Sequence, residues 1–195
     1  ITSITIFNSI VYYSLYYTQV ISGILMISTI PVWILFFAFV LKIEKTNIFQ
    51  ISGVILSLTG VLFIITKADI NLIKELEFNK GDLSMVIGML SWATYSALLR
   101  KKNHPISQIA LLEIIIICGF IFLIPIYFIE MSLGNKIVLG LPFILTLSYV
   151  VLFPGLFAFL FWIKGIDIIG ASRSGVFLHQ MTIFGALIAI IILGE

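Results

Sequence analysis

The first 41 residues of this chain contain no aspartate, glutamate, lysine or arginine. Long uncharged runs of this kind are typical of membrane spans, because a helix needs about 20 apolar residues to cross a hydrocarbon core of about 30 Å. Backbone amides in lipid must pair internally, and the apolar runs here are too long for barrel strands. The chain is therefore expected to cross a membrane as helices.

The rest of the chain has the same character. Hydrophobic residues make up 61% of its 195 residues and charged residues 10%, and the mean hydropathy is +1.22. Roughly a quarter of the residues in a soluble domain are charged, so these values predict an all-α polytopic membrane protein. A net charge of +2 is too small to suggest a nucleic-acid partner. The single cysteine, Cys118, excludes an internal disulfide and a cysteine-rich metal site, and no cofactor is expected.

Turns and charged residues divide the chain into about seven predicted spans, at residues 4–17, 20–41, 45–67, 82–100, 106–129, 137–163 and 174–193. The chain begins inside an apolar run without a signal-peptide pattern, so further residues are expected before Ile1. Lysines and arginines fall unequally on the two sides of the predicted spans. Seven follow the second, fourth and sixth spans, namely Lys42, Lys45, Arg100, Lys101, Lys102, Lys164 and Arg173, against four on the other side, Lys67, Lys74, Lys80 and Lys136. The positive-inside rule predicts that the first group is cytoplasmic.

Two segments far apart in the sequence share a pattern. Both "TQVISGILMISTIPVWILFFAFVLKIE" and "GASRSGVFLHQMTIFGALIAIIILGE" start with small residues, continue as one apolar helix and end on an acid. Ser22 lies 22 residues before Glu44, and Ser174 lies 21 residues before Glu195. This spacing indicates an internal repeat. Because a further span follows Glu44, another helix is expected beyond Glu195.

Four stretches in this order resemble the EamA domain of the drug/metabolite transporter superfamily: "STIPVWILFFAFVLKIEK", "QISGVILSLTGVLFI", "GDLSMVIGMLSWATYSALLRKK" and "GASRSG…LGE". The resemblance implies a ten-helix transporter fold built from two inverted five-helix repeats. Residues 1–66 would then be the last three helices of the first repeat, and residues 67–80 a connecting loop. Residues 81–195 would be the second repeat without its final helix. The resemblance also implies a multi-pass protein of a prokaryotic cell membrane.

Polar side chains inside the predicted spans are candidate cavity residues, because such groups are costly in lipid unless they face a cavity or a partner. In the last span, Ser172, Gly175, His179 and Thr182 recur at helical spacing on one face, with Gln180 beside them. The fourth span carries Ser91, Trp92 and Tyr95, and the first carries Asn8 and Tyr12. The predicted substrate-cavity residues are therefore His179, Thr182, Gln180, Tyr95, Trp92, Ser91, Asn8 and Tyr12.

Two ionisable groups are candidates for proton coupling, His179 and Glu113. Each has an alternative that the sequence leaves open. His179 could instead donate one hydrogen bond between helices. Glu113, two turns into its span, could instead reach the interface or pair with a lysine.

A further set of residues is predicted to be structural. Gly53 and Gly60 form a small-residue strip that would let another helix approach closely. Pro31 removes one backbone hydrogen bond and permits a kink. Glu44 and Gly81 belong to the motifs that carry the resemblance.

These features predict a secondary transporter that moves a small organic metabolite or drug by alternating access, as an exporter or exchanger. No phosphate-binding glycine loop of the Walker type occurs in the sequence, so no ATP-driven motor is expected. No intramembrane protease motif occurs either, so an enzyme is not expected. The alternative is a non-transporting membrane scaffold. The expected partners are a small-molecule solute and the lipid bilayer, and a homodimer is left open.

Overall fold

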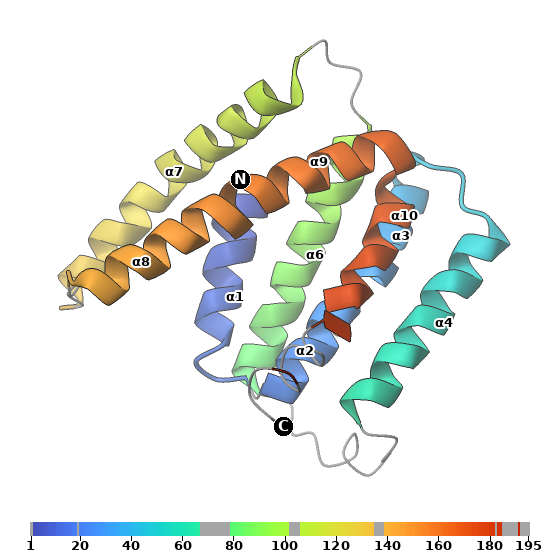
Figure 1. The fold of residues 1–195 in the computed structure, drawn as a ribbon, viewed down its shortest axis with the longest axis horizontal. Coiled ribbons are helices and arrows are strands. Elements are labelled where there is room, and N and C mark those ends of the chain that lie inside the picture. Colours follow the sequence, from blue (N-terminus) through green and yellow to red (C-terminus); the bar gives the residue numbers. More distant parts are fainter. Residues whose placement is uncertain are drawn as a thin grey trace.

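The computed structural model describes residues 2–18, 20–66, 79–101, 106–134, 139–181, 183–184 and 191, and no strand occurs among them. This confirms the all-α prediction. The helical elements are shown in Figure 1. They are η1 (Thr2–Asn8), α1 (Ser9–Ser14), α2 (Val20–Ser28), α3 (Ile30–Val40), α4 (Ile48–Ile65), α6 (Lys80–Arg100), α7 (Gln108–Ser132), α8 (Leu141–Val150), η2 (Val151–Phe157), α9 (Ala158–Ile169), α10 (Ala171–Val176) and η3 (Phe177–His179).

Within the described ranges, four helical stretches are long and apolar enough to cross a membrane. They are Ser22–Val40, Lys80–Arg100, Gln108–Ser132 and Leu141–Ile169. Ile48–Phe63 in α4 is a shorter apolar helix. The polytopic membrane architecture expected from the charge-free runs is therefore present.

The predicted span at residues 20–41 is interrupted at its centre. α2 ends at Ser28, and α3 begins at Ile30 with Pro31 in its first turn. The amide of Val32 donates to the Thr29 carbonyl at 3.0 Å, which tightens the backbone at the junction. The break lies where the proline was expected to permit a kink, because proline has no amide proton to continue the helical ladder.

α6 is the central helix of the bundle. Its first turn is closed by a capping box, in which Asn79 Oδ1 accepts from the amides of Gly81 and Asp82, and Asp82 Oδ2 accepts from the Asn79 amide at 2.8 Å. A Cβ atom at Gly81 would lie 2.7 Å from the Ser14 carbonyl oxygen and closer still to Thr18. Only glycine therefore fits where the end of α1 crosses the start of α6.

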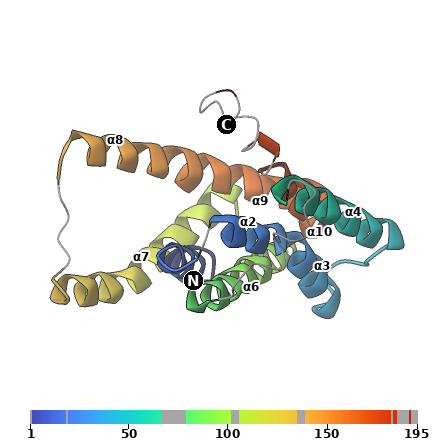
Figure 2. The same cartoon turned by 90° about the horizontal axis from the view of Figure 1, so that it is seen from below.

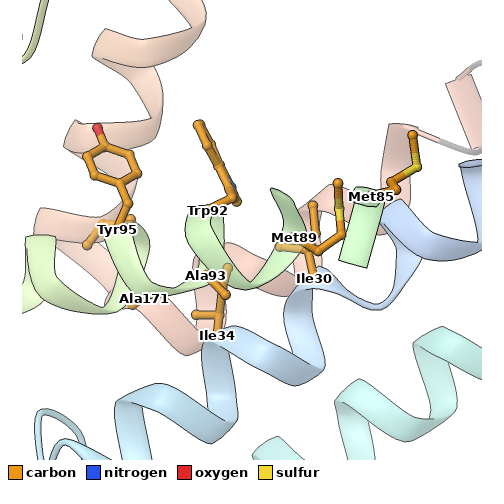
Figure 3. Close-up of a cluster of buried hydrophobic side chains, with 9 residues drawn as sticks. Ile30, Ile34, Met85, Met89, Trp92, Ala93, Tyr95 and Ala171 are labelled. Atoms are coloured by element: carbon orange, nitrogen blue, oxygen red, sulfur yellow. The ribbon is translucent and has the colours of Figure 1, made fainter. Parts of the chain in front are cut away.

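The buried core lies where α6 packs against α3. Figure 3 shows Ala93 and Ile34 facing each other between these two helices, while the rings of Trp92 and Tyr95 project from a different side of α6. The cluster also includes Ile30, Met85, Met89, Ile166 and Ala171. The aliphatic members hold the helices together, and the aromatic members lead to the cavity described below.

The helix after the 139–140 connection is longer than predicted. α8, η2 and α9 form one continuous rod that runs to Ile169, whereas the predicted span ended at 163 (Figure 2). Lys164, which the predicted boundary placed after the span, lies within α9, and both Lys164 and Asp167 are exposed on the last turns of the rod, where charged side chains can reach solvent. The chain reverses at Gly170, whose φ of 92° favours glycine.

Candidate functional site

A cavity of about 440 Å³ lies between segments from the two predicted repeats. This volume falls within the range of small-molecule pockets in proteins. Residues 1–66 contribute η1, α1, α2 and α3 to its wall, and residues 81–195 contribute α6, the α8–α9 rod and η3. The lining residues are Phe7, Asn8, Tyr12, Ile27, Ile30, Trp92, Val150, Pro154, Gly155, Ala158, Phe159, Trp162, Leu178 and Met181.

Trp92 is the centre of an aromatic cluster in this wall. Its ring centroid lies 4.7 Å from that of Phe7, 5.5 Å from that of Phe159 and 5.7 Å from that of Trp162. Tyr95, one turn along α6, is 5.4 Å from Trp92. These separations fall in the range at which aromatic rings attract one another. The cluster presents ring faces and edges to the cavity.

The polar lining is small and uncharged. Among the described residues around the cavity there is no lysine, arginine, aspartate or glutamate. Asn8 and Tyr12 offer an amide and a hydroxyl, and neither side chain forms a hydrogen bond with another described residue. The indole nitrogen of Trp162 is already engaged, because Nε1 donates to the Ser96 hydroxyl at 3.2 Å. Only two polar side chains of the described wall are therefore free to orient a bound molecule.

Irregular helix surrounds this cavity. Phe7 and Asn8 belong to the π-helical segment η1, and Pro154 and Gly155 to the π-helical segment η2. Ile27 and Ile30 flank the break between α2 and α3, and Leu178 lies in the 3₁₀ turn η3. π-helical and 3₁₀ segments inside α-helices are frequent at functional sites. Four of the surrounding helices thus depart from α geometry at the level of the cavity.

His179 is buried, with 3% of its surface exposed, but it is not part of the cavity lining. Its Nε2 atom lies 2.7 Å from the Ser28 carbonyl oxygen, and its Nδ1 atom lies 2.5 Å from the Ser57 hydroxyl. A carbonyl oxygen only accepts, so Nε2 carries the proton and, in the neutral ring, Nδ1 accepts from Ser57. These contacts join η3 to α2 and α4. They favour the interhelical alternative that the sequence left open.

Glu44 joins the two predicted repeats at the end of the bundle that is predicted to be cytoplasmic. Its carboxylate accepts from the amides of Ala171 at 2.7 Å and Ser172 at 3.2 Å, the first residues of α10. Arg100 Nε lies 3.7 Å from the same carboxylate, and Arg100 Nη1 donates to the Asp167 carbonyl at 2.8 Å. A carboxylate at a helix start satisfies amides that have no partner in the helix.

The other predicted site residues within the described ranges are not among the residues that line the cavity. Tyr95 is buried, and its hydroxyl has no hydrogen-bond partner among the described residues. Ser91 is half-buried on α6, and Gln180 and Glu113 are exposed. Thr182 lies outside the described residues. Of the eight predicted cavity residues, Asn8, Tyr12 and Trp92 line the cavity.

The glycine strip of α4 does not have the close neighbour that was expected. A Cβ atom added at Gly53 or at Gly60 would meet no described atom within 4 Å. α4 meets its neighbours instead through the buried Val54 and Val61 and through the hydrogen bond of Ser57 to His179. Small residues permit close packing but do not by themselves bring a helix to that face.

Three aromatic wall residues were missed by sequence reasoning: Phe7, Phe159 and Trp162. In a chain with 14% aromatic residues, single rings stand out little. The pair Pro154-Gly155 inside a predicted span could have indicated that this helix lines a site, because interrupted membrane helices mark binding sites in transporters.

In comparison with known proteins, this chain matches a transporter family and proteins named as transporters. Residues 79–195 match the sequence model of the EamA-like transporter family. The uncharacterized transporter YyaM of Bacillus subtilis is 26% identical over 94% of this chain and 60% of its own length. An uncharacterized transporter of Archaeoglobus fulgidus is 23% identical over 100% of this chain and 66% of its own length. YetK of Bacillus subtilis, also named an uncharacterized transporter, is 24% identical over 100% of this chain and 59% of its own length.

The chain thus spans roughly three fifths to two thirds of the length of the curated relatives it matches. No solved structure matches it significantly.

Proposed function

Because the chain belongs to the EamA-like transporter family, we propose that it forms part of a secondary transporter that moves a small organic solute across the membrane by alternating access. The position of the cavity carries this proposal. Its wall is built from both predicted repeats, residues 1–66 and 81–195, and two similar halves can rock about a site at their interface. Interrupted helices around the site supply the backbone freedom for such a motion.

The Glu44 junction is the proposed closure on one side of the cavity. It connects α3 of the first repeat to the start of α10 in the second, and Arg100 extends it to the end of α9. Rocking of the halves would break these contacts and open the cavity toward the side predicted to be cytoplasmic. The contacts are polar, and the Arg100 side chain is 40% exposed, so water can replace them when they separate.

The proposal extends to the direction of transport and to its coupling to protons. The transporter works as an exporter or exchanger in a prokaryotic cell membrane. Glu113, exposed on α7, is the remaining candidate for a proton-coupling group, whereas both ring nitrogens of His179 are engaged in helix contacts. The homodimer that the sequence leaves open is compatible with the large exposed apolar surface of α7 and α8.

The test is solute flux through the full-length protein in proteoliposomes, screened across metabolite classes with and without a proton gradient. We expect saturable flux for at least one organic solute and its loss in Trp92→Ala. Leu145→Ala, at an exposed position of α8 away from the cavity, is the matched control and should leave flux unchanged. Folded protein that carries no solute in the whole screen would overturn the proposal and favour the scaffold alternative.

A further inference from the structure

We propose that the cavity binds an uncharged, planar aromatic solute that carries one hydrogen-bonding group. This inference rests on the proposed function and names the class of solute for that same site. It follows from three properties of the described wall residues: the arrangement of their rings, the lack of a charged side chain among them and the position of the two free polar groups.

The rings form a surface on which another ring can stack. Phe7 of η1 and the two rings Phe159 and Trp162 of α9 surround Trp92 of α6. Each of the four lines the cavity. Because Trp162 Nε1 is bound to Ser96, that indole presents its ring rather than its polar edge to a ligand. A planar aromatic molecule gains offset-stacked or edge-to-face contacts here that an aliphatic molecule of equal size does not.

The lack of charge selects among aromatic molecules. An ionic group that enters the cavity loses its hydration, and the described wall offers no opposite charge to replace it. His179, next to the lining residue Leu178, is turned toward Ser28 and Ser57. Ring faces attract a cation, but without a carboxylate this attraction alone must offset the whole loss of hydration. The wall therefore favours a neutral solute over a cation, an anion or a zwitterion.

Asn8 and Tyr12 supply the hydrogen-bonding end of the site. Asn8 ends η1 and Tyr12 lies in α1, whereas Phe159 and Trp162 come from α9. Tyr12 also lines a second groove, of about 750 Å³, which holds four more tyrosines and one carboxylate, Tyr13, Tyr16, Tyr17, Tyr127 and Glu130. A solute with its ring on Trp92 and its polar group at Asn8 would thus point that group toward the tyrosine-lined groove, which we assign as the route to the cavity.

The test uses four small molecules with one ring system and different side chains. Tryptophol is neutral with a hydroxyl, 3-ethylindole is neutral without one, tryptamine is a cation and indole-3-acetate is an anion. Binding to the full-length protein in nanodiscs is measured by isothermal titration calorimetry. We expect tryptophol to bind at least tenfold more tightly than either ion. Asn8→Leu should remove the preference for tryptophol over 3-ethylindole.

Variants separate the site from the fold. Phe159→Leu should weaken tryptophol binding about tenfold with an unchanged melting temperature. Phe161→Leu, a change at a ring on the exposed face of the same helix, should have no effect on binding. Tighter binding of tryptamine or indole-3-acetate than of tryptophol would overturn the inference. So would an equal loss of tryptophol affinity in Phe159→Leu and Phe161→Leu.

The proteoliposome screen distinguishes failure of this inference from failure of the proposed function. Flux of other metabolites by a protein that does not bind tryptophol would refute the solute class and leave the transporter proposal standing. Binding of tryptophol with the expected variant pattern, but no flux of any solute, would refute transport and leave the aromatic site standing.

Discussion

The imidazole of His179 forms hydrogen bonds to two neighbouring helices, α2 and α4. The break before Pro31 diverts the Val32 amide to Thr29, and His179 supplies a donor to the Ser28 carbonyl next to it. The other ring nitrogen, Nδ1, accepts a hydrogen bond from the hydroxyl of Ser57 on α4. A single side chain thus joins two helices across a point where the backbone ladder is interrupted, which explains why a costly polar group is retained there.

We predict that His179→Ala lowers the stability of the full-length protein by about 1–3 kcal/mol, because it leaves buried hydrogen-bonding groups without a partner. Transport by the surviving folded molecules should remain near that of the unmodified protein. The melting temperature in detergent and the flux per folded molecule, measured on the same preparation, check both parts. A stable variant with abolished flux would restore the solute-contact role predicted from the sequence.

Gly170 is the second residue for which the structure predicts the effect of a substitution on stability. Its φ of 92° strains any side chain, and a Cβ atom there would collide with the Glu44 carboxylate that caps α10. We predict that Gly170→Ala is destabilised by more than about 1 kcal/mol. Gly134 also has a positive φ of 89° but an open environment, so Gly134→Ala isolates the backbone cost in a comparison of folded yield and melting temperature. If Gly170→Ala and Gly134→Ala lower the melting temperature equally, the Glu44 contact contributes nothing to the destabilisation.

At the scale of elements, η2 is the clearest departure from regular helix. Pro154 has no amide to offer the Val150 carbonyl, and the Ala158 amide bonds back to Phe153, five residues earlier. A Cβ atom at Gly155 would lie 3.0 Å from the Val150 carbonyl oxygen, so the glycine makes room for that group. The wider turn places Pro154 and Gly155 in the cavity wall.

We predict that Pro154→Ala restores an amide donor, allows an α-helical bond to Val150 and so reshapes this wall. Solute affinity should fall by about tenfold, while the melting temperature rises or stays constant, because proline removal adds a hydrogen bond inside a helix. Pro142→Ala, in the first turn of α8 where proline costs no helical bond, is the control. Unchanged affinity in Pro154→Ala would mean that the π-helical turn has no part in the site.

Sequence reasoning recovered the elements better than their contacts. The spans follow from hydropathy, and α6 was placed within two residues at its start and to the residue at its end. Ser172, Gly175 and His179 do share a buried face, as their spacing predicts. That face packs on other helices, with Gly175 close to Pro31 and Ile34, whereas Leu178 and Met181 line the cavity. Periodicity identifies a face but not the neighbour that it meets, which depends on how all the helices are arranged.

The whole molecule has a dense part and an extended part. α6, α3 and α10 carry most of the buried core. α7 and the α8–α9 rod reach outward, as Figures 1 and 2 both show. Most apolar side chains of these outer helices are exposed. Within the described residues, α8 has no buried side chain. Such surfaces are stable only against lipid or further protein, in keeping with a membrane protein.

Orientation is a property of the whole molecule and gives a further prediction. With Cys118→Ala as background, Lys101→Cys lies at the end predicted to be cytoplasmic and Leu133→Cys at the opposite end; both positions are exposed. An impermeant thiol reagent applied to intact cells should label the second and spare the first. The reverse pattern would invert the assignment, and with it the side on which the Glu44 junction closes the cavity.

The π-helical turn of η2 also has a consequence for how this chain should be compared with its relatives. One residue of an α-helix corresponds to a rotation of about 100° and a rise of about 1.5 Å. A homologue that lost a single residue between Val151 and Phe157 could return to regular α-helix and still present the same faces of α8 and α9. A single-residue gap elsewhere in the rod would instead turn every side chain beyond it away from its neighbours. Evolutionary insertions and deletions in this helix should therefore concentrate in those seven positions, beside the cavity.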